Sequence, residues 1–130
     1  MKWNKKYHYP SSTRSVHKGF RHYALKNQML PSVTSIIEMT KTDREKESLA
    51  TWKQRVGEKE SAVISSEAAK RGSEMHSNIE QFLLGKDNLN LFEDEKEKSK
   101  SRMMSDLIIE EGLRDKLEEI HGVECVLYYP

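Results

Sequence analysis

The stretch AAKRGSEMHSNIEQFL, residues 68–83, has the spacing of a helix with an unusual face. At 3.6 residues per turn, one stripe of that helix carries Ala69, Gly72, His76, Ile79 and Leu83. Glu80 lies at the edge of the stripe, one turn after His76. An imidazole four residues after a glycine leaves room for another backbone, a metal ion or a phosphate to approach. The alternative is that Gly72 marks close helix packing and that His76 is a partly buried residue with one hydrogen-bond partner.

Basic residues are concentrated at the N-terminus. Of the 22 Lys and Arg residues, seven lie within residues 1–30, which contain no Asp or Glu: Lys2, Lys5, Lys6, Arg14, Lys18, Arg21 and Lys26. The other 100 residues hold 15 basic and 21 acidic side chains and so carry a net charge of −6. The chain is therefore a basic arm on an acidic body, and such arms often contact polyanions.

Composition narrows the class of protein. With 35% hydrophobic and 33% charged residues, the 130-residue chain has a modest core and is one domain or part of one. The single cysteine, Cys125, rules out an internal disulfide and is typical of a reducing compartment. Nucleophile elbows, phosphate-cradling glycine loops and paired Cys or His zinc spacings are absent. Because no apolar run approaches the ~20 residues of a membrane span and no signal-peptide core is present, we expect a cytoplasmic protein without membrane contact.

The first third of the chain predicts an arm followed by a hairpin. Residues 1–20 mix basic and aromatic side chains with Ser, Thr and proline, which favours an extended or mobile arm. Residues 20–33 form two short extended stretches around residues 26–28, a β-hairpin with a polar turn. Pro31 closes this hairpin, and Ser32 is placed to cap a short helix.

Three longer helices are predicted next. Thr42 and Glu45 form a capping box that opens the first of them, and Gly57 ends it. The second helix spans about residues 61–84 and contains the His76 stripe. The third spans about residues 100–120, with an inward face made of Met103, Leu107, Leu113, Leu117 and Ile120.

Two further segments complete the chain. Residues 85–101 predict a charged connector, and the clusters at residues 94–96 and 44–46 are typical of solvated surface. The segment VECVLYY, residues 123–129, is rich in β-branched and aromatic residues and predicts a buried strand. A lone strand cannot satisfy its own backbone groups, so it joins the N-terminal hairpin or belongs to a sheet beyond this sequence.

The order of these segments resembles the front half of a RecB-like nuclease. That group lies within the PD-(D/E)XK superfamily and includes phage exonucleases and the mitochondrial genome maintenance exonuclease. The likeness covers about residues 20–128 and is carried by LPSVT at residues 30–34, by residues 52–57, and by RGS followed by His76 and Glu80 at residues 71–80. It implies an α/β, restriction-endonuclease-like fold. This chain would be its mostly helical N-terminal part, with an N-terminal β-hairpin and one C-terminal core strand.

The domain division expected from the resemblance is simple. Residues 1–20 form the basic aromatic arm, and residues 21–130 form the N-terminal portion of a single nuclease domain. The family's Asp at the end of a strand, and its Asp/Glu-x-Lys on the next strand, have no counterpart after Glu124. We therefore expect a truncated product or fragment that is inactive alone.

The resemblance also implies a metal-dependent DNA exonuclease that uses Mg²⁺ or Mn²⁺. In such nucleases the helix histidine after RG faces the metal site, so His76 would be a metal ligand or its close neighbour. Glu124, in the first core strand, matches an acidic position and would have a catalytic role. Phosphodiester hydrolysis needs a divalent cation held by hard oxygen ligands, which one imidazole cannot replace.

The basic arm predicts contacts with DNA that is single-stranded or has free ends. Its aromatic rings would stack on bases while its charges follow phosphates, although an ordinary disordered tail has a similar composition. The residues expected to bind nucleic acid are Lys2, Lys5, Lys6, Arg14, Lys18, Arg21 and Arg71. Two alternatives stay open: a non-catalytic nucleic-acid-binding module, and a helical interaction protein in which His76 is a core residue.

Overall fold

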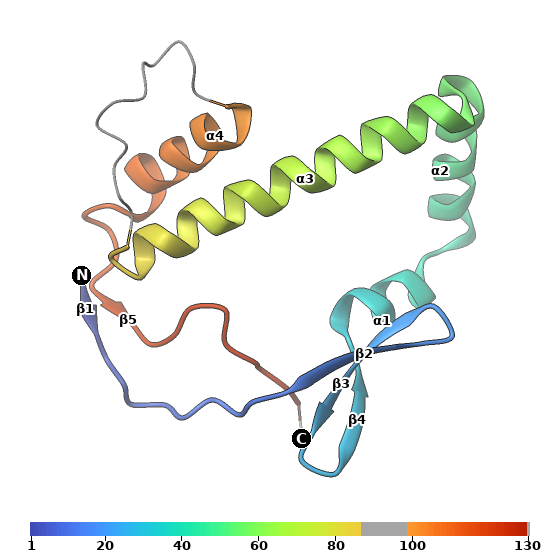
Figure 1. The fold of residues 1–130 in the computed structure, drawn as a ribbon. Coiled ribbons are helices and arrows are strands. Elements are labelled where there is room, and N and C mark those ends of the chain that lie inside the picture. Colours follow the sequence, from blue (N-terminus) through green and yellow to red (C-terminus); the bar gives the residue numbers. More distant parts are fainter. Residues whose placement is uncertain (87–98, 130) are drawn as a thin grey trace. The chain divides into compact units, whose positions relative to one another are not determined.

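The computed structural model describes residues 1–86 and 99–129. These residues form a mixed α/β structure with four α-helices, a three-stranded antiparallel sheet and a two-stranded parallel sheet (Figure 1). They divide into two compact units: residues 8–61 with the segment from residue 125, and residues 1–7 with residues 62–124. Each unit is described by itself.

The three-stranded sheet belongs to the unit of residues 8–61. Its strands are β2 (Thr13–His17), β3 (Phe20–Leu25) and β4 (Gln28–Pro31), in the order β2-β3-β4. The predicted hairpin is confirmed as β3 and β4. Strand β2 lies in the segment expected to be an arm, and its two-residue turn to β3, Lys18-Gly19, has φ values of 51° and 82°. Positive φ at both central residues is the backbone of a tight hairpin turn and explains the glycine.

Two helices follow the sheet, and both begin where capping residues predict. In α1 (Val33–Thr40), the Ser32 side chain accepts a hydrogen bond from the backbone N–H of Ser35. The Ser35 hydroxyl in turn accepts from the backbone N–H of Arg21 at 3.0 Å, which ties the helix to β3. In α2 (Asp43–Val56), the Thr42 and Glu45 capping box is complete. The predicted caps are confirmed because they depend only on neighbouring residues.

The capping box makes α2 sensitive to acid. The backbone N–H of Thr42 and then its hydroxyl, each 2.8 Å from the Glu45 carboxylate, lower the pKa of Glu45. A lowered folded pKa adds stability above the unfolded pKa that is lost as pH falls through the folded value. We therefore expect the NMR amide shift of Thr42 to titrate with the lowered pKa of Glu45, and the Thr42 cap to open below it.

Glu45→Gln is the matched variant, because its amide oxygen still accepts from Thr42 but does not titrate. The Thr42 amide should then stay constant across the same acid range. An unchanged titration in Glu45→Gln would assign the effect to another carboxylate.

Helix α3 (Glu58–Leu83) lies mostly in the other unit, where it packs beside α4 (Lys100–Ile108), which continues into one π-helical turn, η1 (Ile109–Leu113). Helix α3 begins three residues earlier than predicted, because the acidic Glu58 and Glu60 suit the positive end of a helix directly after Gly57. Strand β1 (Lys2–Trp3) pairs in parallel with β5 (Glu119–Ile120).

The predicted helix over residues 100–120 is wrong in its last part. Helical structure ends at Leu113, and Asp115 has a φ of 58°, which a continuing helix does not allow. Ile120 is buried as predicted, but it lies in β5 and not on a helix. Pairing with β1 satisfies backbone groups that a longer helix would have kept for itself.

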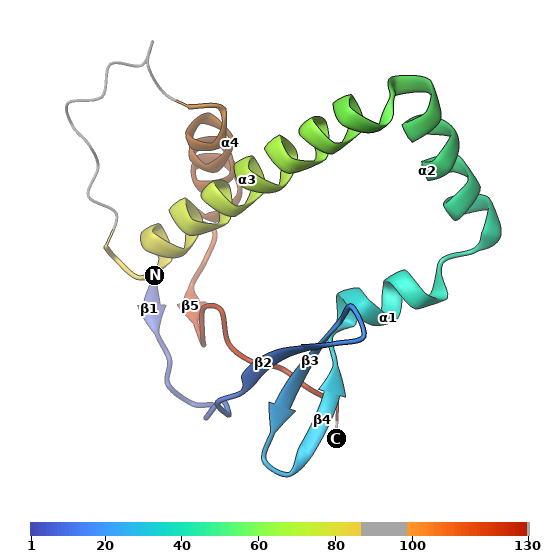
Figure 2. The same cartoon turned by 45° about the vertical axis from the view of Figure 1, so that its right-hand side comes forward.

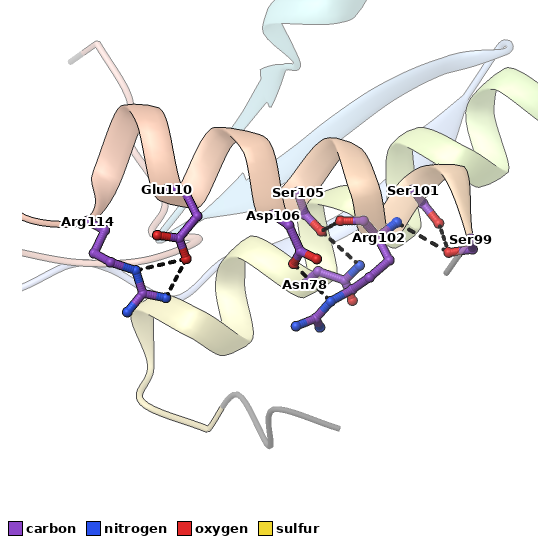
Figure 3. A network of polar contacts seen from close by, with 8 residues as sticks. All are labelled: Asn78, Ser99, Ser101, Arg102, Ser105, Asp106, Glu110 and Arg114. Atoms are coloured by element: carbon purple, nitrogen blue, oxygen red, sulfur yellow. Dashed lines mark hydrogen bonds and ion pairs between the residues drawn. The ribbon is translucent and has the colours of Figure 1, made fainter. Parts of the chain in front are cut away.

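The predicted inward face of α4 is also wrong. Met103 and Leu107 are 50% and 58% exposed, whereas Ser101, Ser105 and Ile109 are buried at four-residue intervals. The serines are small, so they let α4 approach α3 closely, and they bond to it. Figure 3 shows Asn78 of α3 donating to the Ser105 hydroxyl at 3.2 Å, and Ser101 donates to Glu74 at 2.7 Å.

Charged side chains of α4 and η1 are paired along the helix. Arg102 lies 3.0 Å from Asp106, and Arg114 lies 2.8 Å from Glu110 (Figure 3). Both are pairs at four-residue spacing on the helix surface, where each contributes only a few tenths of a kcal/mol. The carboxylates of Asp106 and Glu110 are therefore paired with arginines and are not free to bind a metal ion.

The predicted C-terminal core strand is wrong. Residues 123–129 form no strand, and Leu127 and Tyr129 are 81% and 92% exposed. Residue composition favours a strand here, but a strand also needs a neighbouring strand to pair with, and none of the strands in the described residues pairs with this segment. Within the described ranges, no helix has both the length and the apolar character that crossing a bilayer demands. Most of the predicted charged connector, including residues 94–96, lies outside the described residues.

Candidate nucleic-acid interface

The register of β2 and β3 gathers two arginines and a tyrosine on one face of the sheet. Arg14 pairs with Tyr23, and Val16 pairs with Arg21. Cross-strand partners share a face and side chains alternate along a strand, so Arg14, Arg21 and Tyr23 lie together. We call these three residues the arginine face. Both arginines are exposed, Tyr23 is half-buried, and Lys18 adds an exposed charge. Lys18 lies in the turn that joins β2 to β3, two neighbouring strands of the sheet in Figure 2.

The first lysines of the chain belong to the other unit, where the N-terminal segment is held in place. Asn4 donates to the Glu119 carboxylate at 2.8 Å, and β1 pairs with β5. The Lys6 ammonium lies 5.3 Å from the centre of the Tyr7 ring, a cation–π distance. Lys2, Lys5 and Lys6 are exposed. The predicted arm residues are therefore divided between the two units.

The predicted residues on α3 lie at its surface. His76 is exposed and Arg71 is half-buried. A side chain added at Gly72 would meet nothing within 4 Å in the described residues, so close helix packing does not account for this glycine. The alternative in which His76 is a core residue is wrong, because its side chain faces solvent. Gly72 and His76 lie one turn apart on α3, with free space beside the glycine and the histidine exposed.

Glu124 is not where the resemblance placed it. The residue is exposed in a bend with a φ of 51° and lies in no strand. Among residues 1–86 and 99–129, no three or more His, Cys, Asp or Glu side chains are grouped so that they could hold a metal ion. Mg²⁺ requires near-octahedral oxygen coordination, so His76 and Glu124 do not by themselves fit the metal that the resemblance implies.

The open space above Gly72 predicts the effect of adding a methyl group. Gly72→Ala should stabilise the unit containing α3 by about 1 kcal/mol, since alanine is favoured over glycine in a helix and nothing obstructs its Cβ. Urea unfolding followed by circular dichroism measures the change. Gly57→Ala is the matched control and should destabilise, because Gly57 has a φ of 97°. A loss of stability in Gly72→Ala would restore the packing explanation.

The sequence did not point to Tyr23, because it lies beyond residues 1–20, the segment expected to form the basic aromatic arm. The alternation of residues 13–17, followed by Lys18-Gly19, is the signal that could have placed it. Comparison of the chain with models of protein families, with curated proteins and with solved structures found no match.

Proposed function

We propose that this chain binds DNA through the arginine face of β2 and β3 and forms the DNA-contacting N-terminal portion of a metal-dependent nuclease of the RecB-like type. The observation that carries the binding proposal is the register that places Arg14 and Arg21 around Tyr23. The nuclease assignment has a different support, the resemblance of residues 30–34, 52–57 and 71–80 to that family.

The chemistry of the arginine face suits a single strand. Guanidinium groups bind phosphate oxygens through two parallel hydrogen bonds, and they stay charged at any physiological pH. Tyr23 has Arg14 directly across the sheet and Arg21 two residues along its own strand. A base stacked on the tyrosine ring would therefore have its flanking phosphates within reach of both arginines, as in single-strand binders.

Removing both arginines tests this proposal. The double variant Arg14→Ala/Arg21→Ala should bind a labelled single-stranded oligonucleotide at least about ten-fold more weakly at low salt. Each phosphate contact contributes about 0.7 to the log–log salt slope on single strands, so the slope should fall by about 1.4. Fluorescence anisotropy over a salt series measures both quantities.

Arg44→Ala/Arg55→Ala on α2 is the matched control, because it removes the same charge from two exposed arginines elsewhere in the same unit. Its affinity should change little. Equal losses in the two double variants would mean that only net charge matters, and the proposed face would be abandoned.

A further inference from the structure

The opposite face of the same sheet brings two histidines together. Ser15 and His17 alternate with Arg14 and Val16 along β2, and Ser15 pairs with His22 of β3. The rings of His17 and His22 have centroids 6.3 Å apart and an interplanar angle of 78°. His17 is exposed and His22 is half-buried. We call Ser15, His17 and His22 the histidine face.

The hydrogen bond of His22 determines which of its nitrogens can bind a ligand. His22 Nδ1 lies 3.1 Å from the backbone oxygen of Phe20. A carbonyl oxygen only accepts, so Nδ1 carries the hydrogen and the neutral ring keeps its lone pair on Nε2. Histidines that bind metals almost always donate their second ring N–H in this way, which orients the ring and makes it a better ligand.

Ser15, the cross-strand partner of His22, has an unsatisfied polar atom. Its hydroxyl oxygen is shielded from solvent and has no hydrogen-bond partner in the described part of the chain. A buried hydroxyl without a partner is costly, by about 1–3 kcal/mol, and calls for a physical explanation. Rotation of the Ser15 side chain toward a water bound to an ion on the histidine face would give this hydroxyl a partner.

We propose that His17 and His22 bind a divalent transition-metal ion of the Zn²⁺ type, with water completing its coordination. Imidazole nitrogens favour Zn²⁺, Cu²⁺ and Ni²⁺ over Mg²⁺. The rings of His17 and His22 would lie on either side of one ion, each with a zinc–nitrogen bond of about 2.0–2.1 Å. His17 is exposed, so its side chain can turn to bring a ring nitrogen to the ion. This site is separate from any Mg²⁺ chemistry involving His76 and does not depend on DNA binding.

Calorimetric titration of the whole chain with Zn²⁺ alone tests the site, in a Cys125→Ser background that removes the thiol. We expect one equivalent to bind and Mg²⁺ to give no heat. His17→Gln and His22→Gln should each weaken Zn²⁺ binding by roughly 10- to 100-fold or more, since even loss of a supporting hydrogen bond has that effect. His8→Gln removes an exposed imidazole elsewhere in the same unit and should leave binding unchanged.

NMR of the histidine ring nitrogens gives a second test that needs no variant. Before zinc is added, His22 should show its hydrogen on Nδ1, and zinc should then shift the ring signals of His17 and His22 but not of His8. The proposal is overturned if Zn²⁺ does not bind, if binding survives both glutamine variants, or if the zinc-induced shifts fall on other histidines.

Discussion

If the proposed nuclease function holds, a form of this protein that also carries the Asp and Asp/Glu-x-Lys residues of RecB-like nucleases should lose Mn²⁺-dependent DNA cleavage by orders of magnitude on His76→Ala, while its melting temperature barely changes. His76 is exposed, and the turn before it, at Gly72, is open. A solvent-facing side chain contributes little to stability, so losing it changes stability by about 0.5 kcal/mol or less. The proposed function makes His76 a metal ligand or its close neighbour, so its loss would act instead on the bound ion that neutralises developing charge.

Two variants on the same helix separate these effects. Ser77→Ala alters the exposed residue next to His76 and should affect neither cleavage nor melting. Ile79→Ala truncates a half-buried apolar side chain and should lower the melting temperature without a specific catalytic defect. A His76→Ala protein that melts early but still cuts DNA would give the histidine a structural role only.

The largest expected effect on stability comes from Ile109. This residue is 3% exposed, one of three buried hydrophobic residues in the described part of the chain, and it lies where α4 passes into η1. Ile109→Ala removes buried methylene and methyl groups and leaves a cavity, which costs about 2–5 kcal/mol. Domains are typically stable by only about 5–15 kcal/mol, so the urea midpoint of the unit containing α3 and α4 should fall sharply.

Leu107→Ala provides the comparison on the same helix. Leu107 is 58% exposed, so its truncation should cost less than about 1 kcal/mol, although the sequence pattern predicted it to face inward. Urea unfolding monitored by circular dichroism measures both variants. If Leu107→Ala were the more damaging change, the serine-lined contact between α3 and α4 would have to be reconsidered.

The candidate site was only partly visible in the sequence. Arg14 and Arg21 stood out because charge is a property of each residue, but nothing in their spacing alone showed that they share a face. Their common face results from the pairing of β2 with β3, which also places His17 and His22 on the other side. Glu124 was misplaced because its assignment assumed a strand that the described residues do not form.

Elements defined by close neighbours could be predicted from the sequence by itself. The Ser32 cap, the Thr42 and Glu45 box, and the end of α2 at Gly57 all depend on groups within four residues of one another. The β3–β4 hairpin is of the same kind, since a short polar turn fixes its register. Such hydrogen bonds form between residues that the chain already holds together, so little else can override them.

Only the tertiary structure decided which surfaces were buried and where the last helix ended. Asn4 bonds to Glu119, 115 residues away, and the β1–β5 pairing beside them takes residues that periodicity assigned to a helix. On α4 the predicted apolar stripe is exposed, and Ser101 and Ser105 are buried in its place. These serines form hydrogen bonds with Asn78 and Glu74 of α3 at close approach. A helix presents several faces that could each be buried, and the one chosen depends on the partner surface, which lies far away in the sequence.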